Sequence, residues 1–248
     1  MATPIQTNGI IIKEYNFDEA DKIFVIFTAD KGKISCLAKG VRKSRSKMRG
    51  FLQLFTYSKL HLHKGKSMYT IIGGEAINSF PQVKNDLLLF GYANYITEVL
   101  ENILPTEEKN NAIFSNTVSL FHLMGSIPIS QLSSYYMLRL IKYAGFLPEL
   151  SRCVLCGERI DANALFHNIE GGCVCVQCGK EFDNKAYIPL YIIRIMEQLL
   201  SMDINMLGRL KVKDRDQFFI EDLLCEYLKS VLERPINSIK FIREIRDA

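Results

Sequence analysis

The chain has 248 residues, 48% of them hydrophobic and 23% charged, which is the balance of a globular protein with a buried core. Its net charge of +4 is unevenly placed: residues 1–80 hold 13 Lys and Arg against 6 Asp and Glu, and residues 81–248 hold 18 against 21. No apolar run approaches the ~20 residues of a membrane span, and no signal peptide is visible, which argues against membrane and secreted proteins. We therefore expect a cytoplasmic protein whose basic first part meets a polyanion, with a merely solubilising surface as the alternative.

The first eighty residues predict short β-strands separated by turns. Residues 9–13, 23–28 and 34–38 are rich in apolar and β-branched side chains, and a turn signal joins the last two. Residues 51–63 alternate between apolar and polar side chains, and residues 68–72 follow as a fifth strand. Five short strands in about eighty residues suit a small closed barrel of the OB-fold type, with an SH3-like barrel as the alternative.

Beyond residue 80 the spacing of apolar residues changes to the period of a helix. Helices are predicted over residues 87–103, about 110–124, 130–145, 189–202 and 216–233, with proline or glycine near their ends. The fold class is therefore α+β: an OB-fold barrel over residues 1–80, followed by an all-α domain over residues 81–248. The domain boundary is expected near residues 79–84.

A cysteine-rich segment, residues 151–180, is inserted in the helical domain. It holds two copies of the pattern Cys-x-x-Cys-Gly, in which each turn can present two thiolates to one ion and the glycine can take a positive φ that closes the backbone beneath the metal. Four thiolates complete a tetrahedral shell, so we expect one structural Zn2+ and no catalytic water; paired core cysteines or a redox dithiol are the alternatives. The predicted ligands are Cys153, Cys156, Cys175 and Cys178.

Three other cysteines and one histidine are not expected to bind the metal. Cys173 is not followed by the x-x-Cys-Gly turn that follows the first cysteine of each predicted pair. His167 lies between the two pairs and is expected to be an ordinary loop or strand residue. Cys36 and Cys225 fall in apolar strand and helix patterns, where a cysteine behaves as a small core residue.

A basic loop, residues 39–50, lies between two predicted strands and holds six cations and no acid. Arginine and serine side chains of this kind grip phosphate oxygens without reading base sequence, whereas a solvated loop is the alternative. Nearby aromatic residues are candidates for stacking on bases, although most aromatics of a small barrel fill its interior: Phe51, Phe55, Tyr57 and Tyr69. The predicted DNA-binding residues are Lys39, Arg42, Lys43, Arg45, Lys47, Arg49, Lys59 and Lys66.

Motifs of catalysis are missing from the sequence. It has no phosphate-binding loop of the Walker type, no Gly-x-Ser-x-Gly and no His-Glu-x-x-His. His61 and His63 share a strand face but have no evident third ligand. We therefore expect a binding protein and not an enzyme.

In the order and spacing of several segments the chain resembles the RecO family of bacterial recombination and repair mediators. The barrel contributes residues 21–23, 27–32 and 38–42. The helical part contributes residues 138–153, which contain Gly-Phe-Leu-Pro before the first cysteine, and residues 164–178, which contain Gly171 and Gly172.

The resemblance implies an OB-fold that binds single- and double-stranded DNA and anneals complementary strands. It also implies a RecR partner, loading of the RecA recombinase onto gaps coated with single-stranded-DNA-binding protein (SSB), and a helical domain that binds the SSB C-terminal tail. The zinc would be structural, as some relatives lack the cysteines, and no nucleotide would be hydrolysed. Cys173 is an addition to the family pattern. The protein would be cytoplasmic and associated with the nucleoid.

An acidic tail that ends in an apolar residue needs a cation beside an apolar groove. Arg139 and Lys142 on the third predicted helix are candidates, and two solvated helix cations are the alternative interpretation. For the whole chain, the alternatives are an RNA-binding or translation-associated OB and zinc protein, and a nucleic-acid enzyme that uses zinc only as a scaffold. The enzyme would need a cluster of carboxylates that the sequence does not show.

Overall fold

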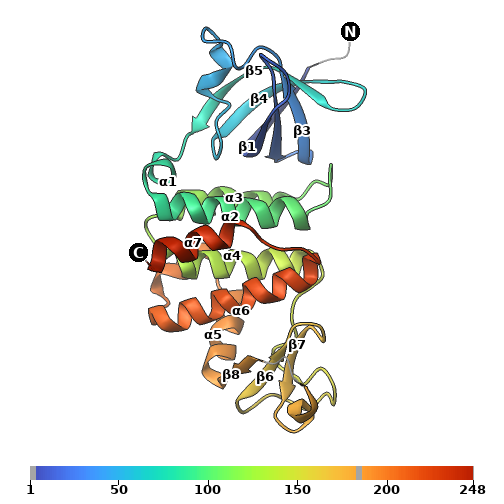
Figure 1. Ribbon diagram of the computed structural model, residues 1–248, viewed down its shortest axis with the longest axis vertical. Helices are drawn as coiled ribbons and strands as arrows, with labels where there is room; N and C mark the ends of the chain where they lie inside the picture. Colours follow the sequence, from blue (N-terminus) through green and yellow to red (C-terminus); the bar gives the residue numbers. More distant parts are fainter. Residues whose placement is uncertain (1–3, 183–185, 248) are drawn as a thin grey trace. The chain divides into compact units, whose positions relative to one another are not determined.

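The computed structural model describes residues 4–182 and 186–247 (Figure 1). The chain divides into two compact units: Met1–Gly125 with Ser238–Ala248, and Ser126–Asn237. The barrel therefore shares its unit with the first helices and with the last helix of the chain. The predicted boundary near residues 79–84 marks the point in the sequence where the barrel strands end and the helices begin. The two compact units instead group the residues that contact one another most.

A closed barrel of five strands forms the first part of the chain, with the strand order β1-β2-β3-β5-β4. Neighbouring strands are antiparallel except β3 and β5, which pair in parallel through Cys36 with Tyr69 and Leu37 with Thr70. Closure leaves no open sheet edge, and the prediction of an OB-type barrel is confirmed. The strands are β1 Ile5–Asn16, β2 Lys22–Thr28, β3 Gly32–Ala38, β4 Tyr57–Lys64 and β5 Tyr69–Asn78.

Residues 51–56 were predicted as strand, and this prediction is wrong. Lys47–Gly50 form a short 3-10 helix, after which Leu52 N–H donates to the Met48 carbonyl and the chain continues in turns. Phe55 has a φ of +62° and donates its N–H to Ile11 O, a conformation that no strand contains. The apolar side chains of this stretch are buried from turns and not from extended backbone: Phe51 and Leu52 lie in the barrel core, and Phe55 packs against Phe90 and Phe121.

The apolar interior of the barrel comes from alternate positions of its strands, so each strand has one face inside. The turn between β2 and β3 places Gly32 at a φ of +63°, where an added Cβ would collide with the Glu108 carbonyl oxygen. Only glycine fits here. The core residues of the barrel are Ile11, Phe24, Ile26, Ile34, Cys36, Ala38, Val41, Phe51, Leu52, Leu60, Leu62, Tyr69 and Ile71.

Four helices accompany the barrel in the first unit. The N-terminus of α2 is capped by Asp86, whose carboxylate accepts from Leu89 N–H, and that of α3 is capped by Asn110, which accepts from Ile113 N–H. At the other end of α2, the Lys33 ammonium donates to the Glu101 and Leu104 carbonyls, which a helix leaves without internal partners. The helices are α1 Pro81–Asn85, α2 Leu87–Ile103, α3 Asn111–Leu123 and α7 Ser238–Asp247.

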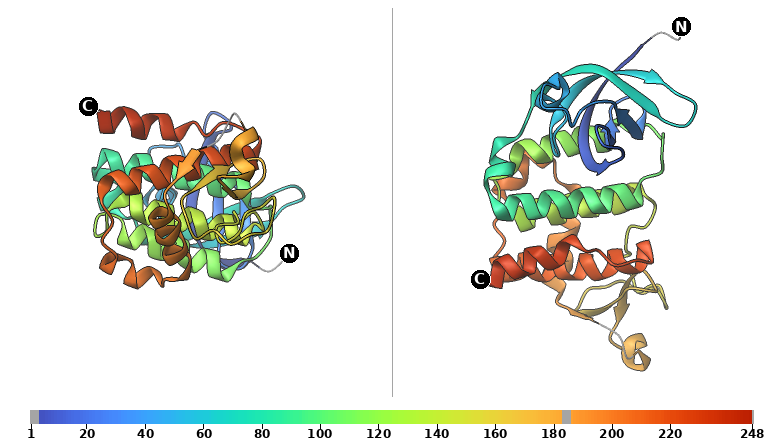
Figure 2. Two further views of the ribbon diagram at one scale, coloured as in Figure 1. Left: turned by 90° about the horizontal axis from the view of Figure 1, so that it is seen from below. Right: turned by 45° about the horizontal axis from the view of Figure 1, so that its top comes forward.

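The last helix, α7, was not predicted. It packs along α2, where Gly91 allows close approach: an added Cβ would lie 3.1 Å from Phe241 Cδ1. The Ser238 N–H donates to Glu98 Oε2 at 2.9 Å, which ties the start of α7 to the same helix. The two helices run side by side in Figures 1 and 2. Ile239 and Ile242 are buried, and their spacing of three is the helical signal the sequence offered.

The second unit contains three long helices and a small sheet with strand order β7-β6-β8. The helices lie where the sequence predicted them, while the three short strands within and after the cysteine-rich segment were not predicted. No helix in the described part of the chain is long and apolar enough to cross a membrane. The elements are α4 Ile129–Tyr143, β6 Ala164–His167, β7 Gly172–Cys175, β8 Ala186–Ile188, α5 Leu190–Ser201 and α6 Asp214–Leu232.

Candidate functional site

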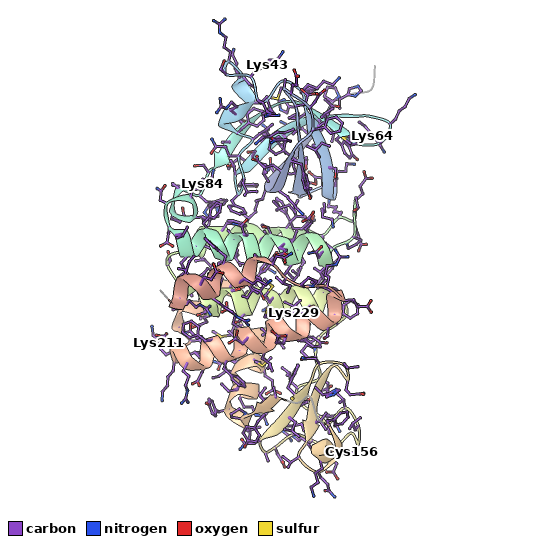
Figure 3. All side chains as sticks on the ribbon, in the orientation of Figure 1. Lys43, Lys64, Lys84, Cys156, Lys211 and Lys229 are labelled. Atoms are coloured by element: carbon purple, nitrogen blue, oxygen red, sulfur yellow. The ribbon has the colours of Figure 1, made fainter. Side chains whose placement is uncertain are left out.

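Four cysteine sulfurs meet in the second unit, each within 4.8 Å of the others: Cys153, Cys156, Cys175 and Cys178. Two belong to the turn that follows α4, one ends β7, and one begins a 3-10 helix, Cys178–Glu181. Cys156 lies near the end of its unit in Figure 3. These are the four predicted ligands, and the fold brings them into one cluster that could hold a metal ion.

The first cysteine turn is closed by backbone hydrogen bonds. Cys153 N–H donates to Glu158 O at 2.7 Å, and Gly157 N–H donates to Cys153 O at 2.9 Å. Gly157 has a φ of +76°, so the predicted role of this glycine is confirmed.

The second cysteine turn closes differently. Gly179 does not have a positive φ, which contradicts the expectation for it. Its backbone lies against Leu165 instead, and an added Cβ would collide with the Leu165 side chain. A larger residue at this turn would have to displace the Leu165 side chain, a contact that only the packing of the sheet reveals.

Backbone N–H groups surround the sulfur atoms. Cys175 N–H points at Cys153 Sγ (3.4 Å), and Cys178 N–H points at Cys175 Sγ (3.5 Å). Burial alone would raise the pKa of Cys153, but N–H groups of Cys156, Cys175 and Leu155 outweigh it and lower the pKa to about 6. Hydrogen bonds to Cys175 and Cys156 raise the pKa of Cys178 to about 12. A bound cation would favour the deprotonated form of every sulfur that coordinates it.

Cys173 lies outside this cluster. It is fully buried in β7 opposite Phe166, and burial raises the pKa of its thiol to about 12. His167 accepts a hydrogen bond from Glu170 N–H, and its ring lies against that of Phe182, with the centroids 4.2 Å apart and the planes tilted by 48°. Neither residue belongs to the group of four sulfurs that could hold a metal ion.

The cysteine-bearing segment is held against α6 within its unit. The Phe166 ring meets the Tyr227 ring edge-on, with centroids 5.6 Å apart, and the Tyr227 hydroxyl donates to Phe146 O at 2.7 Å. Gly172 lies so close to Glu149 that a Cβ would be 2.7 Å from the Glu149 nitrogen. A metal bound here would stabilise a segment already fixed on the helices.

The basic loop, residues 39–50, is a series of turns on the barrel. Gly40 N–H donates to the Asp21 carboxylate at 2.7 Å, and Arg42 N–H donates to Ala20 O at 3.0 Å, so the loop is tied to the turn between β1 and β2. Lys43 points away from the barrel in Figure 3. All six cations are exposed, and none makes an ion pair in the part of the chain that the structure describes: Lys39, Arg42, Lys43, Arg45, Lys47 and Arg49.

Beside this loop the barrel has a groove of about 470 Å³. We call it the barrel groove. It was not predicted, because its walls come from four separate stretches of sequence. The lining residues are Glu14, Asn16, Lys22, Phe24, Val41, Arg42, Arg49, Leu52, Gln53 and Leu54.

The other predicted DNA-binding lysines lie on β4 and beyond it. Lys59 is half-buried, with its ammonium 3.8 Å from the Glu75 carboxylate. Lys66 is exposed in the short connection between β4 and β5, residues 65–68, at the tip of a hairpin that projects from the barrel in Figure 2. Of the aromatic residues considered for stacking on bases, Phe51, Phe55 and Tyr69 are buried and have no exposed ring face to offer.

Arg139 and Lys142 lie on α4 and have different surroundings. The Arg139 guanidinium is half-buried, lies 4.9 Å from the centre of the Tyr135 ring and donates to the Met202 carbonyl. Lys142 is exposed in the last turn of the helix. Arg139 thus has a structural role already, and only Lys142 is a fully solvated cation.

Comparisons with known proteins span both parts of the chain. The family model described as "Recombination protein O N terminal" matches residues 1–80, and "Recombination protein O C terminal" matches residues 84–240. A "DNA repair protein RecO" of Alkaliphilus metalliredigens is 30% identical over 244 residues, covering 97% of this chain and 99% of that protein. One of Symbiobacterium thermophilum is 30% identical over 246 residues, covering 97% of each. The chain therefore belongs to the RecO family of DNA repair proteins.

Proposed function

We propose that this protein is a mediator of DNA repair and recombination that binds single- and double-stranded DNA through its phosphates. The observation that carries the proposal is the basic loop, in which six exposed cations stand together without acidic partners among the described residues. Arginine and lysine at this density neutralise phosphate charge and release condensed counterions, but do not read base sequence. Lys59 and Lys66 would extend the contact along β4 and its loop.

The test is a binding titration of the full chain against a labelled single strand, a duplex and an RNA of the same sequence, at several salt concentrations. If all six loop cations neutralise phosphates, the slope of log K against log salt is about −4 for a single strand and about −5 for a duplex. A slope near zero would refute phosphate binding. Clearly tighter binding of the RNA would favour the RNA-binding alternative.

The mediator activity itself extends this binding. We propose that the protein anneals complementary strands and, with RecR, helps load RecA onto DNA coated with SSB. The support is membership of a family whose relatives carry the name of a DNA repair protein. Annealing of bare and SSB-coated strands is the assay, and annealing no faster than without protein would contradict it. On this proposal the protein works in the cytoplasm at the nucleoid and catalyses no reaction.

For the metal centre we propose one structural zinc ion. Sulfurs at the corners of a tetrahedron with Zn–S bonds of about 2.3 Å lie about 3.8 Å apart. The Sγ atoms of Cys156 and Cys175 are 3.9 Å apart, close to this spacing, and all four sulfurs lie within 4.8 Å of one another, so they would draw together on binding the ion. Four thiolates leave no position for a reactive water, which supports a structural role.

We propose the barrel, residues 1–80, as the DNA-binding domain and residues 81–248 as the domain that meets protein partners. The junction of the two family matches supports this boundary. Within the helical domain, Lys142 and Arg139 are proposed to meet the acidic SSB tail. Arg139 also donates a hydrogen bond to the Met202 carbonyl, so its replacement would disturb the fold as well as the proposed site. Lys142→Ala is therefore the cleaner test of tail binding. An unchanged affinity for a peptide of the SSB tail would contradict the proposal.

A further inference from the structure

The seven cysteines of the chain differ in how far solvent reaches them. Cys156 is exposed, and Cys175 and Cys178 are half-buried. The remaining four are buried: Cys36, Cys153, Cys173 and Cys225. Oxidation of a cysteine by a dissolved oxidant depends on access to its sulfur and on its thiolate character. Access therefore makes Cys156 the cysteine most open to attack.

The turn that carries Cys156 is open on its outer side. Residues 155–159 are all exposed, and a Cβ added to Gly157 would meet no atom within 4 Å apart from its chain neighbours. The turn is closed at its base, where Cys153 N–H donates to Glu158 O and Gly157 N–H donates to Cys153 O. Cys156 lies near the end of its unit in Figure 3. The tip of the turn therefore has space to shift while its base stays in place.

A second sulfur lies within reach of Cys156. Its Sγ atom is 3.9 Å from that of Cys175, which belongs to the other cysteine turn. A disulfide bond is about 2.05 Å long, so the two sulfurs would have to approach by about 2 Å. The open first turn can supply this movement. The buried thiol of Cys173, by contrast, lies outside the cluster and opposite Phe166.

The proposed zinc ion makes these sulfurs reactive and depends on them in turn. Sulfurs that coordinate a metal are thiolates, the nucleophilic form of cysteine. Zinc has no redox chemistry of its own, so an oxidant acts on sulfur. Structural zinc sites are almost always four-coordinate. If Cys156 and Cys175 are joined to each other, Cys153 and Cys178 are left and no longer complete the shell.

We propose that Cys156 is a site of oxidation by peroxides, and that its oxidation joins it to Cys175 in a disulfide and releases the zinc ion. The Cys156 thiolate attacks one oxygen of hydrogen peroxide; the O–O bond breaks, leaving a sulfenic acid and a hydroxide. The Cys175 thiolate attacks the sulfenic sulfur; an S–S bond forms, the S–O bond breaks and a second hydroxide leaves. Two electrons pass from the thiolates to the peroxide, and two protons from solvent convert the hydroxides to water. The inference rests on the structural zinc proposed above and deepens it.

The test follows zinc and thiols together in the full chain. Zinc content is measured first, and the protein then meets a modest excess of hydrogen peroxide in the presence of a chromogenic zinc indicator, with a sample without peroxide as the reference. Remaining thiols are alkylated, and disulfides are located by mass spectrometry. We expect one zinc ion released for every two thiols lost, with Cys156 joined to Cys175 and Cys173 still reduced. Thiol reductant with added Zn2+ should restore the site, because a disulfide is a reversible product.

The outcomes separate the two proposals. Zinc retained in the presence of peroxide, or a disulfide between other cysteines, would overturn the oxidation site and leave the structural zinc standing. Protein that contains no zinc after gentle purification would remove the metal proposal and this inference with it.

Variants test which sulfur is attacked first. Cys156→His keeps a group that can bind zinc, as in structural sites with three cysteines and one histidine, but removes the exposed thiol. Cys173→Ala is the matched control, because it removes a buried thiol outside the cluster. We expect peroxide to release zinc severalfold more slowly from Cys156→His than from the parent, and equally fast from Cys173→Ala. Equal release from Cys156→His and the parent would show that another sulfur is the target, and the disulfide map of the parent decides the question even if a variant fails to fold.

Discussion

Replacing four cations of the basic loop by glutamine is the most direct test of the proposed contact between this loop and DNA phosphates. The change is Arg42→Gln, Lys43→Gln, Arg45→Gln and Lys47→Gln together. All four side chains are exposed, so folding stability should change by no more than about 0.5 kcal/mol per site. Four lost phosphate contacts should flatten the slope of log K against log salt by about 3 for a single strand and by 3 to 4 for a duplex. Between 50 and 200 mM salt, a duplex should therefore lose about a hundredfold less affinity with the variant than with the parent.

The control removes the same charge elsewhere. Arg209, Lys211, Lys213 and Arg215 are four exposed cations of the second unit, none of them predicted to bind DNA. Their replacement by glutamine gives the same net charge, so any difference between the two variants reflects position. Both are measured by anisotropy over a salt series, after circular dichroism has shown intact folding. An unchanged slope in the loop variant, or an equal loss in both variants, would refute the phosphate contact.

Four further predictions concern the metal and the packing. Metal analysis should find one zinc per chain, and Cys156→Ser should abolish it while Cys173→Ala should not; parent protein without zinc would contradict the site. Chelation should raise hydrogen exchange chiefly in residues 151–180, because the ligands lie there; uniform exchange over the chain would argue otherwise. Gly32→Ala should lower the free energy of unfolding by about 1–3 kcal/mol in urea titrations, because the residue needs a positive φ and touches Glu108. Gly91→Leu should cost a similar ~1–3 kcal/mol by separating α2 from α7, and a variant as stable as the parent would show that this contact is loose.

Local spacing determined much of this protein at the level of sequence. The two Cys-x-x-Cys turns predicted the four cysteines whose sulfurs meet in one cluster, because a chelating pair is made by residues three apart. The helices α2 to α6 followed from a 3.6-residue period, and most of the barrel from alternation with turn residues between strands. The basic loop was visible as well, since charge density is a property of composition.

Tertiary structure decided what depends on distant segments. Residues 51–56 have the apolar pattern of a strand, yet they form turns. Backbone hydrogen bonds to Met48 and Ile11 hold these turns, and Phe51 and Phe55 are buried from them. Gly179 lies against the side chain of Leu165, fourteen positions earlier in the chain, and does not have a positive φ. The barrel groove is assembled from the ends of β1 and β2, the basic loop and the turn after it. A hollow exists only where side chains fail to fill space together, so spacing along one stretch of sequence cannot disclose it, whereas a chelating turn or a run of charge is complete within a few residues.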